Sequence, residues 1–331
     1  VTAHDDDGVF LASVGGSVEY RRIFDADIDP RWYGVEYGST DDQKTRVDAM
    51  VQGSIETGIP VLVAQRIFLA QNTTILNSAV IHCTEAGHFH ATGAVTLTFQ
   101  AGSRFNGSGV CFSGTLQPSF AVGTIDALRL SWMGGTDSEK WTRAMASTAA
   151  KLPFLMDVST SVTSDISVPA NLALEPSRGA VLTFAGFANL TISALNFTAP
   201  LQFLAFGAES YVGAVSIGSP VVYMEWFGGS ASNLGPANAI PFKACCSAKR
   251  IDLQARSLDY VVTSANTFTI SDFVTWNGNG SKITLNQAIT VIGIYLNNIL
   301  VYGSGSITHS SCIATDSSVI PPLLNGPTVA I

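Results

Sequence analysis

Acidic side chains are the residues of this sequence best suited to chemistry on a sugar. Hydrolysis of a glycosidic bond needs two carboxyl groups about 5–9 Å apart, one of them protonated and the other ionised. Asp157 with Asp165 is one candidate pair, and Asp252 with Asp259 and Asp272 is a second candidate set. Acidic residues are otherwise sparse in the strand-like regions. We therefore interpret these carboxylates as isolated turn or cap residues and predict no catalytic pair.

Histidine and cysteine form one cluster that resembles a metal site, made of His82, Cys83, His88 and His90. Imidazole and thiolate groups bind zinc or iron, and a His-x-His segment from three chains can converge on one axis. The Gly, Ala and Thr residues around the cluster favour a packed or solvated loop instead. We predict no metal and no cofactor. The sequence also contains no G-x-S-x-G, H-E-x-x-H or P-loop motif.

Aromatic side chains are the third group with possible chemistry, because an exposed ring can stack on a sugar. Candidates for such stacking are Tyr211, Trp276, Tyr295 and Tyr302. Three other tryptophans occur in a repeated context: Trp32-Tyr33-Gly34, Trp132-Met133-Gly134 and Trp226-Phe227-Gly228. Their context predicts that Trp32, Trp132 and Trp226 pack against a helix and the first coil that follows them.

The Trp-x-Gly tripeptides define an internal repeat. Trp32 and Trp132 are 100 positions apart, and Trp132 and Trp226 are 94 apart. A short apolar run precedes each tripeptide, and a polar turn follows it. A regular period of this kind is the signature of a repeat architecture. The repeat motif consists of Trp32, Gly34, Trp132, Gly134, Trp226 and Gly228.

One helix is expected after each tripeptide. Residues 39–42 form an N-cap cluster ahead of a helix that ends at residues 58–60. Residues 134–137 turn into a second helix, which ends near residues 151–153. A third and weaker helix is expected at residues 237–248, because Pro236 and Pro241 interrupt its pattern.

Short strand-like runs fill the rest of each unit, with turn residues about every eight positions. Residues 95–99 alternate between apolar and polar side chains, as a half-buried strand does. One helix per hundred residues without βαβ alternation favours an all-β solenoid over a doubly wound sheet. A β-sandwich is the alternative, although it does not readily explain the recurring helix. The predicted organisation is lead-in strands at 1–30, then modules at 31–130, 131–224 and 225–331.

The composition is apolar but not that of a membrane-spanning chain. Only 13% of the 331 residues are charged, against about 25% in a typical globular domain. The mean hydropathy is +0.30, yet no apolar run approaches the roughly 18 residues of a membrane helix. The net charge of -8 argues against nucleic acid as a partner. The low charge predicts a covered surface and hence a tight oligomer.

The cysteines and the start of the chain indicate a reducing compartment without export. The five cysteines are scattered and form no C-x-x-C pair, which indicates buried thiols more than disulfides. The cysteines are Cys83, Cys111, Cys245, Cys246 and Cys312. Residues 1–7 have neither a basic segment nor an apolar one, so no signal peptide is expected.

The turn motif resembles that of pectate-lyase-like right-handed β-helices in bacteriophage tailspikes and tail fibres. In that family a Trp-Phe-Gly-Ala turn leads into an acidic cap and a helix. Residues 226–229 are similar to this turn, and residues 31–34 with 40–42 are similar to the turn and its cap. Residues 20–25 also resemble the family's lead-in. This sequence departs from the family in repeating the motif three times, which indicates a tandem array of short β-helical modules.

The resemblance implies a structural protein of the phage virion, assembled in the cytoplasm of the bacterial host. We expect a non-enzymatic homotrimeric shaft that contacts other tail proteins and supports attachment to a host surface glycan. One alternative is a depolymerase, a glycoside hydrolase or polysaccharide lyase acting on capsule or lipopolysaccharide. Another is a secreted bacterial adhesin. The apolar segments 215–224 and 289–302 are the predicted trimer contacts.

Overall fold

The computed structural model describes the chain without a break from residue 27 to residue 184. It further describes residues 10–12, 19–21, 188–195, 197–199, 202–206, 215–219, 221–230, 232–233, 238, 241 and the strands from residue 250 to residue 308. The chain divides into two compact units, residues 1–155 and 156–331. Neither helix in the described part of the chain has the length and apolarity needed to cross a membrane.

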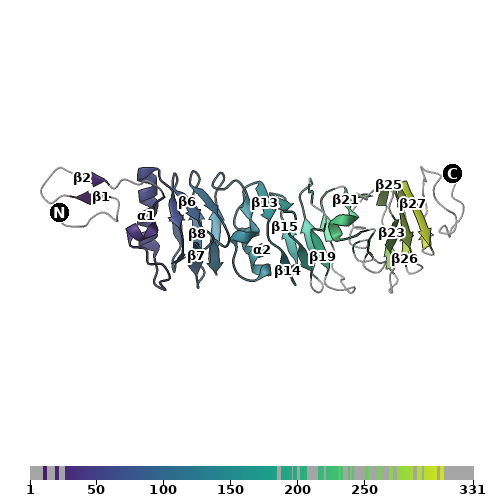
Figure 1. Cartoon of the computed structure of the whole chain (residues 1–331), viewed down its shortest axis with the longest axis horizontal. Coiled ribbons are helices and arrows are strands. Elements are labelled where there is room, and N and C mark those ends of the chain that lie inside the picture. Colours follow the sequence, from purple (N-terminus) through teal and green to yellow (C-terminus); the bar gives the residue numbers. More distant parts are fainter. Residues whose placement is uncertain are drawn as a thin grey trace. The chain divides into compact units, whose positions relative to one another are not determined.

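The first unit is built of coils, each made of three short strands. The first coil contains β3 (Val61–Val63), β4 (Arg66–Phe68) and β5 (Thr73–Ile75). The second contains β6 (Val80–Cys83), β7 (His88–Ala91) and β8 (Thr96–Phe99). The third contains β9 (Arg104–Gly107), β10 (Phe112–Gly114) and β11 (Gln117–Phe120). Equivalent strands pair in parallel, giving the sheets β3-β6-β9, β4-β7-β10 and β5-β8-β11. We call these three coils the first stack (Figure 1).

Alternation of side chains explains why such short strands are stable. Val61 pairs with Ile81, and Ile81 pairs with Phe105, at separations of 20 and 24 residues. All three side chains are buried, and their strand neighbours face outward. Burial of each such side chain contributes about 1.5–3 kcal/mol. The coil repeat therefore forms one continuous apolar column inside the stack.

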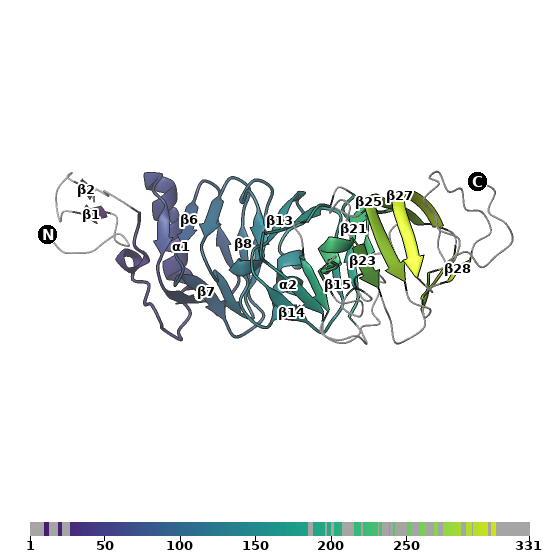
Figure 2. The same ribbon diagram turned by 45° about the vertical axis from the view of Figure 1, so that its right-hand side comes forward.

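The open edge at the N-terminal end of the first stack is covered. The amide of Leu62 donates to the carbonyl of Ile28, and the amide of Gln43 donates to the carbonyl of Phe68. Helix α1 (Lys44–Thr57) packs against β3, β5 and β6. Both views show this helix at the end of the coils, next to the strands around β6 (Figures 1 and 2). Unpaired strand edges invite pairing with other chains, so this cover protects the stack.

The opposite edge of the first stack is covered by the chain that follows it. Phe105 donates its amide hydrogen to Thr124 (2.9 Å), Cys111 to Trp132 (2.9 Å) and Phe120 to Ser147 (2.7 Å). Each of the three sheets therefore has its last strand hydrogen-bonded to residues 124–147. These residues include β12 (Leu128–Arg129) and α2 (Asp137–Ala146), and β12 pairs with β13 (Leu152–Met156).

The start of α1 differs from the predicted cap. The helix begins at Lys44 after Gln43, whose side chain makes no capping hydrogen bond. Asp42 instead accepts from the amide of Lys44 (3.2 Å) and from the amide of Ala70 (2.9 Å). It therefore satisfies the first turn of the helix and also ties it to the first coil. The second helix starts as expected, with Thr136 as its N-cap.

The second unit also stacks parallel strands. Its strands are β14 (Thr160–Val162), β15 (Ile166–Val168), β16 (Leu172–Pro176), β17 (Leu182–Phe184), β18 (Leu190–Ile192), β19 (Leu204–Phe206) and β20 (Val215–Ile217). All of them except β16 form the two sheets β14-β17-β19 and β15-β18-β20. Leu182 pairs with Thr160 on one side and with Leu204 on the other, and all three are buried.

Further strands follow in the same unit, and two of them, β25 and β27, are long. These further strands are β21 (Val222–Tyr223), β22 (Arg250–Asp252), β23 (Asp259–Val262), β24 (Phe268–Ile270), β25 (Val274–Leu285), β26 (Ile289–Ile292), β27 (Ile294–Gly303) and β28 (Ser306–Thr308). Their pairing is parallel, and β25 lies beside β27 with a register shift between Asn277 and Ser281 (Figure 2). The described N-terminal strands β1 (Phe10–Ala12) and β2 (Glu19–Arg21) pair antiparallel.

The prediction of a mainly β solenoid is confirmed, and the sandwich alternative is wrong. A sandwich is built of antiparallel strands, whereas apart from β1 and β2 the described strand pairs are parallel. The expected third helix at 237–248 lies outside the described residues except for positions 238 and 241.

The predicted trimer contact at residues 215–224 is available only in part, because Ile217, Val221 and Tyr223 are half-buried and three other apolar side chains are buried. Val215, Val222 and Met224 are buried within the single chain, at 2% exposure or less. The other proposed contact, residues 289–302, has no described side chains. Outward positions of the first stack are largely polar, for example Thr74, Thr98 and Ser119. Uncharged polar side chains therefore cover much of this surface, and the low charge does not require an apolar exterior.

Candidate functional site

Each of the three tryptophans lies in a turn of 3₁₀ helix. The turns span Pro30–Tyr33, Leu130–Trp132 and Met224–Phe227. Gly34 (φ 76°) and Gly228 (φ 84°) end the first and third turns in the left-handed conformation that glycine adopts without strain. Gly134 differs, because Met133 ends the second turn in an extended conformation and Gly135 has the positive φ of 99°.

Trp132 and Trp226 pack on the coil that precedes them. Trp132 is 2% exposed, its indole Nε1 donates to the carbonyl of Gly107 (2.8 Å), and its ring lies 5.0 Å from that of Phe105. Trp226 is 3% exposed and lies 5.4 Å from the ring of Phe197. The predicted burial is confirmed for both residues. Both rings also contact aromatic residues that precede them in the chain, which the sequence did not predict.

Trp32 departs from the predicted burial, since its side chain is 37% exposed. Among the described residues, no coil of three strands precedes its turn. The next residue, Tyr33, is buried and fills the space under α1. A Cβ atom at Gly53 of that helix would lie 1.8 Å from the Tyr33 hydroxyl.

Asp165, of the first candidate pair, does not have the surroundings of a catalytic acid. Asp165 accepts hydrogen bonds from the Asn189 amide nitrogen (2.8 Å) and side-chain Nδ2 (3.0 Å). The bond from the Asn189 backbone, followed by that from its side chain, lowers the pKa of Asp165. A general acid needs the opposite shift. Asp157 precedes β14, whereas Asp165 follows that strand.

For the second candidate set of carboxylates, the structure describes only backbone positions. Asp252 lies in β22, and its Cα position pairs with Asn277. Asp259 lies in β23 and pairs with Lys282. The side chains of these residues are not described, and Asp272 lies outside the described residues. The candidate stacking residue Tyr211 also lies outside them, and Trp276, Tyr295 and Tyr302 are described only as strand positions.

The histidine–cysteine cluster is divided between two sides of the strands. His82 faces outward from β6, whereas Cys83 faces the core, where burial raises the pKa of its thiol. His90 faces outward on β7 with its Nδ1 2.9 Å from the Ser113 hydroxyl. Burial lowers the pKa of His90, and the nearby charges of Arg66 and His88 lower it further.

No group of three or more His, Cys, Asp and Glu side chains that could hold a metal ion occurs in the part of the chain that the structure describes. The two thiols described, Cys83 and Cys111, are both free and buried. The expectation of reduced, buried cysteines is therefore confirmed for these two residues.

A groove on the outer face of β6 and β9 gathers charges that the sequence reading did not connect. Its volume is about 450 Å³. Val80 pairs with Arg104 and His82 pairs with Asn106, so these four side chains share one face. Residues 123–129 form the opposite wall. We call this site the basic groove; it is lined by Val80, His82, Arg104, Phe105, Asn106, Gly123, Thr124, Ile125, Asp126, Ala127, Arg129 and Trp132.

The coil period is the signal that could have found the basic groove. Arg104 lies 24 positions after Val80, which is one coil, and Asn106 lies one coil after His82. Residues one coil apart stack side by side on the same sheet. Asp126 and Arg129 join the groove only because the chain turns back along β9 after the third coil, and no local pattern predicts that turn.

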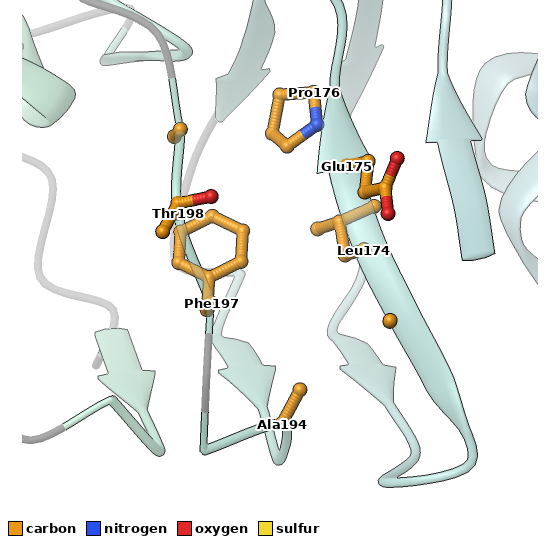
Figure 3. A pocket seen from close by; sticks show the side chains of 8 residues that line it. Leu174, Glu175, Pro176, Ala194, Phe197 and Thr198 are labelled. Atoms are coloured by element: carbon orange, nitrogen blue, oxygen red, sulfur yellow. The ribbon is translucent and has the colours of Figure 1, made fainter. Parts of the chain in front are cut away.

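A second cavity, of about 310 Å³, lies in the second unit between β16 and residues 194–199. Figure 3 shows Leu174 and Phe197 facing each other across it. Glu175 is the one carboxylate among its lining residues, which are Ala173, Leu174, Glu175, Pro176, Ala194, Phe197, Thr198 and Ala199. A single carboxylate does not supply the acid and base that glycoside hydrolysis requires.

A buried carboxylate also connects the third turn to a later strand. Glu225 is buried beside Trp226, and the hydroxyl of Tyr260 in β23 donates a hydrogen bond to its Oε1. Asn238 lies nearby and donates to the carbonyl oxygens of Ser230 and Val261 (both 2.9 Å). These bonds fasten the turn to β23, which is a structural role.

Comparison with protein-family models, with curated proteins and with solved structures finds no match. The assignment of a β-solenoid therefore stands on the strand pairing and burial in this chain.

Proposed function

We propose that this chain is a non-enzymatic shaft of a virion appendage, a phage tail fibre or tailspike, built of tandem right-handed β-helical modules. The observation that carries the proposal is the closure of the first stack at both of its ends. A stack with covered edges does not recruit further strands, so it is suited to serve as a finished segment of a longer rod.

Support for tandem modules comes from one arrangement that occurs around each of the three tryptophan turns. A residue just before the turn pairs in parallel with the first strand that follows the turn. These pairs are Ile28 with Val61, Leu128 with Phe154, and Val222 with Ile251. The chain therefore leaves the sheet, makes the turn, and re-enters beside its point of departure. In the proposal, each such excursion opens a module.

Support for a non-enzymatic role comes from the distribution of carboxylates. The basic groove contains one carboxylate, Asp126, and the second cavity contains one, Glu175. Asp165 is held ionised by Asn189. Retaining and inverting glycosidases both need two carboxyl groups across the scissile bond, and neither cavity supplies a pair.

The remainder of the proposal concerns assembly. In it, three chains associate in the virion, contact other tail proteins and support attachment to a host glycan, after assembly in the bacterial cytoplasm. This part rests on the motif resemblance, since the outward positions of the first stack are polar. Closed threefold symmetry would limit association to a finite particle.

The test is an assay of the purified chain in two measurements. Mass photometry should find particles of three times the 34.8 kDa chain mass. Incubation with a panel of bacterial capsules and lipopolysaccharides should release no reducing ends. A stable monomer would contradict the trimeric shaft. Release of reducing ends or of unsaturated products from any glycan would contradict the non-enzymatic role and indicate a depolymerase.

A further inference from the structure

We propose that Cys83 and Cys111 form a site of reversible oxidation, at which a disulfide bond ties the second coil to the third. This inference goes beyond the proposed shaft role and does not depend on it, because both residues lie within the first stack. Cys83 ends β6, and Cys111 directly precedes β10. Both thiols are free and buried, with 4% and 0% of the residue exposed.

Gly107 leaves the space in which the two cysteine side chains meet. Val63 pairs with Cys83, and Cys83 pairs with Gly107, so these residues occupy one position in three successive coils. Val63 and Cys83 are buried in the core, whereas Gly107 has no side chain to continue the column. A Cβ atom at Gly107 would lie 2.3 Å from the Sγ of Cys111 and 3.5 Å from the Cβ of Cys83. The thiol of Cys111 therefore fills the place of the missing side chain, next to Cys83.

Backbone hydrogen bonds hold the connection that carries Cys111 against the second coil. The amide of Ser108 donates to the carbonyl of Cys83 (3.1 Å), and the amide of Phe89 donates to the carbonyl of Cys111 (2.9 Å). A disulfide forms without backbone movement only between cysteines whose side chains point toward each other. The two side chains converge beside Gly107, so they meet this requirement of direction.

The reaction is thiol–disulfide exchange with a small organic disulfide. One cysteine thiolate attacks a sulfur of the reagent, forms a mixed disulfide and releases one organic thiol. The second cysteine then attacks the cysteine sulfur of the mixed disulfide and releases the other organic thiol. The two cysteines lose two electrons and two protons, which the reagent takes up as it becomes two thiols.

The surroundings of Cys83 set the speed of this exchange. Burial raises the pKa of the Cys83 thiol, and the neighbouring Cys111 thiol raises it further. Because the thiolate is the attacking species, the exchange should be slow at neutral pH and faster as the pH rises. The cross-link would span 28 positions of the chain. Since a disulfide restricts the unfolded chain, the oxidised protein should resist unfolding more than the reduced protein.

Oxidation of the folded full chain with 2-hydroxyethyl disulfide, followed by alkylation of the remaining thiols and peptide mass spectrometry, tests the inference. The peptides that contain Cys83 and Cys111 should be joined, and more rapidly at pH 9 than at pH 7. Dithiothreitol should restore both thiols. The inference is overturned if both thiols stay free, if they carry only the reagent, or if either pairs with another cysteine instead.

Substitutions and urea denaturation measure what the cross-link does. The oxidised parent should unfold at a higher urea concentration than the reduced parent. The oxidant should not shift the midpoint of Cys111→Ala, whereas Cys246→Ala, which alters a cysteine outside the first stack, should respond as the parent does. A circular dichroism spectrum like that of the parent would show that Cys111→Ala is folded. A cross-linked parent that unfolds at the same or a lower urea concentration would contradict the inference.

Discussion

The indole of Trp132 fills the end of the first stack and satisfies a backbone carbonyl at the same time. Its ring meets Phe105 edge to face, and Phe105 lies within an aromatic cluster with Phe99, Phe112 and Phe120. Such ring pairs add about 0.5–1.5 kcal/mol beyond the area they bury. Trp32 occupies the first turn with its side chain 37% exposed, so the two tryptophans differ in burial.

The difference between these two tryptophans predicts different costs of removal. Trp132→Ala should lower the free energy of unfolding by about 3–5 kcal/mol, because it leaves a cavity and deprives the Gly107 carbonyl of its donor. Trp32→Ala should cost less than about 1 kcal/mol, because its side chain is already partly in water. Urea denaturation of both variants measures the two values. Equal costs would show that the burial assigned to Trp132 is wrong.

Gly53 predicts a result opposite to helix propensity. Glycine to alanine in a helix normally stabilises by about 1 kcal/mol. Here Gly53→Ala should destabilise, since the new Cβ would lie 1.8 Å from the Tyr33 hydroxyl. In a Tyr33→Ala background the same substitution should become neutral or stabilising. A double-mutant cycle followed by thermal unfolding measures the coupling, and additive effects would contradict the contact.

Helix α2 shows how an element is fixed by its own ends. Thr136 accepts from the amide of Glu139, and the Glu139 carboxylate accepts from the amide of Thr136 (2.7 Å), which is a capping box. At the other end of the helix, Ser147 accepts the amide hydrogen of Phe120 in β11. The helix therefore also covers the last strand of one sheet.

The capping box predicts a dependence on pH. Hydrogen bonds from the Thr136 backbone and then from its side chain lower the pKa of Glu139 below its ordinary value. A lowered folded-state pKa means that the carboxylate stabilises the fold above its unfolded pKa and that this stabilisation is lost as the pH falls through the folded pKa. The melting temperature of Glu139→Gln should be below that of the parent at pH 7, with the gap narrowing towards pH 3. A constant gap would contradict this role of the charge.

The sequence predicts the elements of the fold better than their connections. Short runs with buried and exposed positions in alternation, such as 95–99, predict strands because the pattern is local. The solenoid was predicted because one helix was expected per hundred residues, without the βαβ alternation of a doubly wound sheet. The site was not predictable in this way, since Arg104 and His82 meet through coil stacking. Asp42 was expected only to help cap α1. It also accepts a hydrogen bond from the amide of Ala70, which lies 28 positions further along the chain.

At the scale of the whole molecule, the sequence favours association into a trimer more strongly than the structure does. The trimer was expected from low charge, but the described outer face of the first stack is polar, and Val215 and Met224 are internal. Residues 289–302 remain the proposed contact. Strand β27 in this region pairs with β25, beginning with Ile294 beside Val274.

A charge placed in that segment tests the proposed trimer. Ile294→Lys should prevent assembly, because an unpaired charge in a subunit interface costs several kcal/mol. Lys140→Glu is the control; it removes an ion pair with Asp137 (2.9 Å) on the surface of α2 and should assemble normally. Mass photometry distinguishes the outcomes. Normal assembly of Ile294→Lys would exclude this segment from the interface.

The Trp132 turn closes the first stack, which precedes it in the chain. Hydrogen exchange with mass spectrometry, comparing the parent with Trp132→Ala, tests this most directly. Because solenoid stability is mainly between neighbours, protection should fall first in the covered strands β9, β10 and β11, while β3 to β5 and the second unit keep theirs. Loss confined to residues 137–156, with β9 to β11 unchanged, would show that the turn belongs to the coil that follows and would contradict the account.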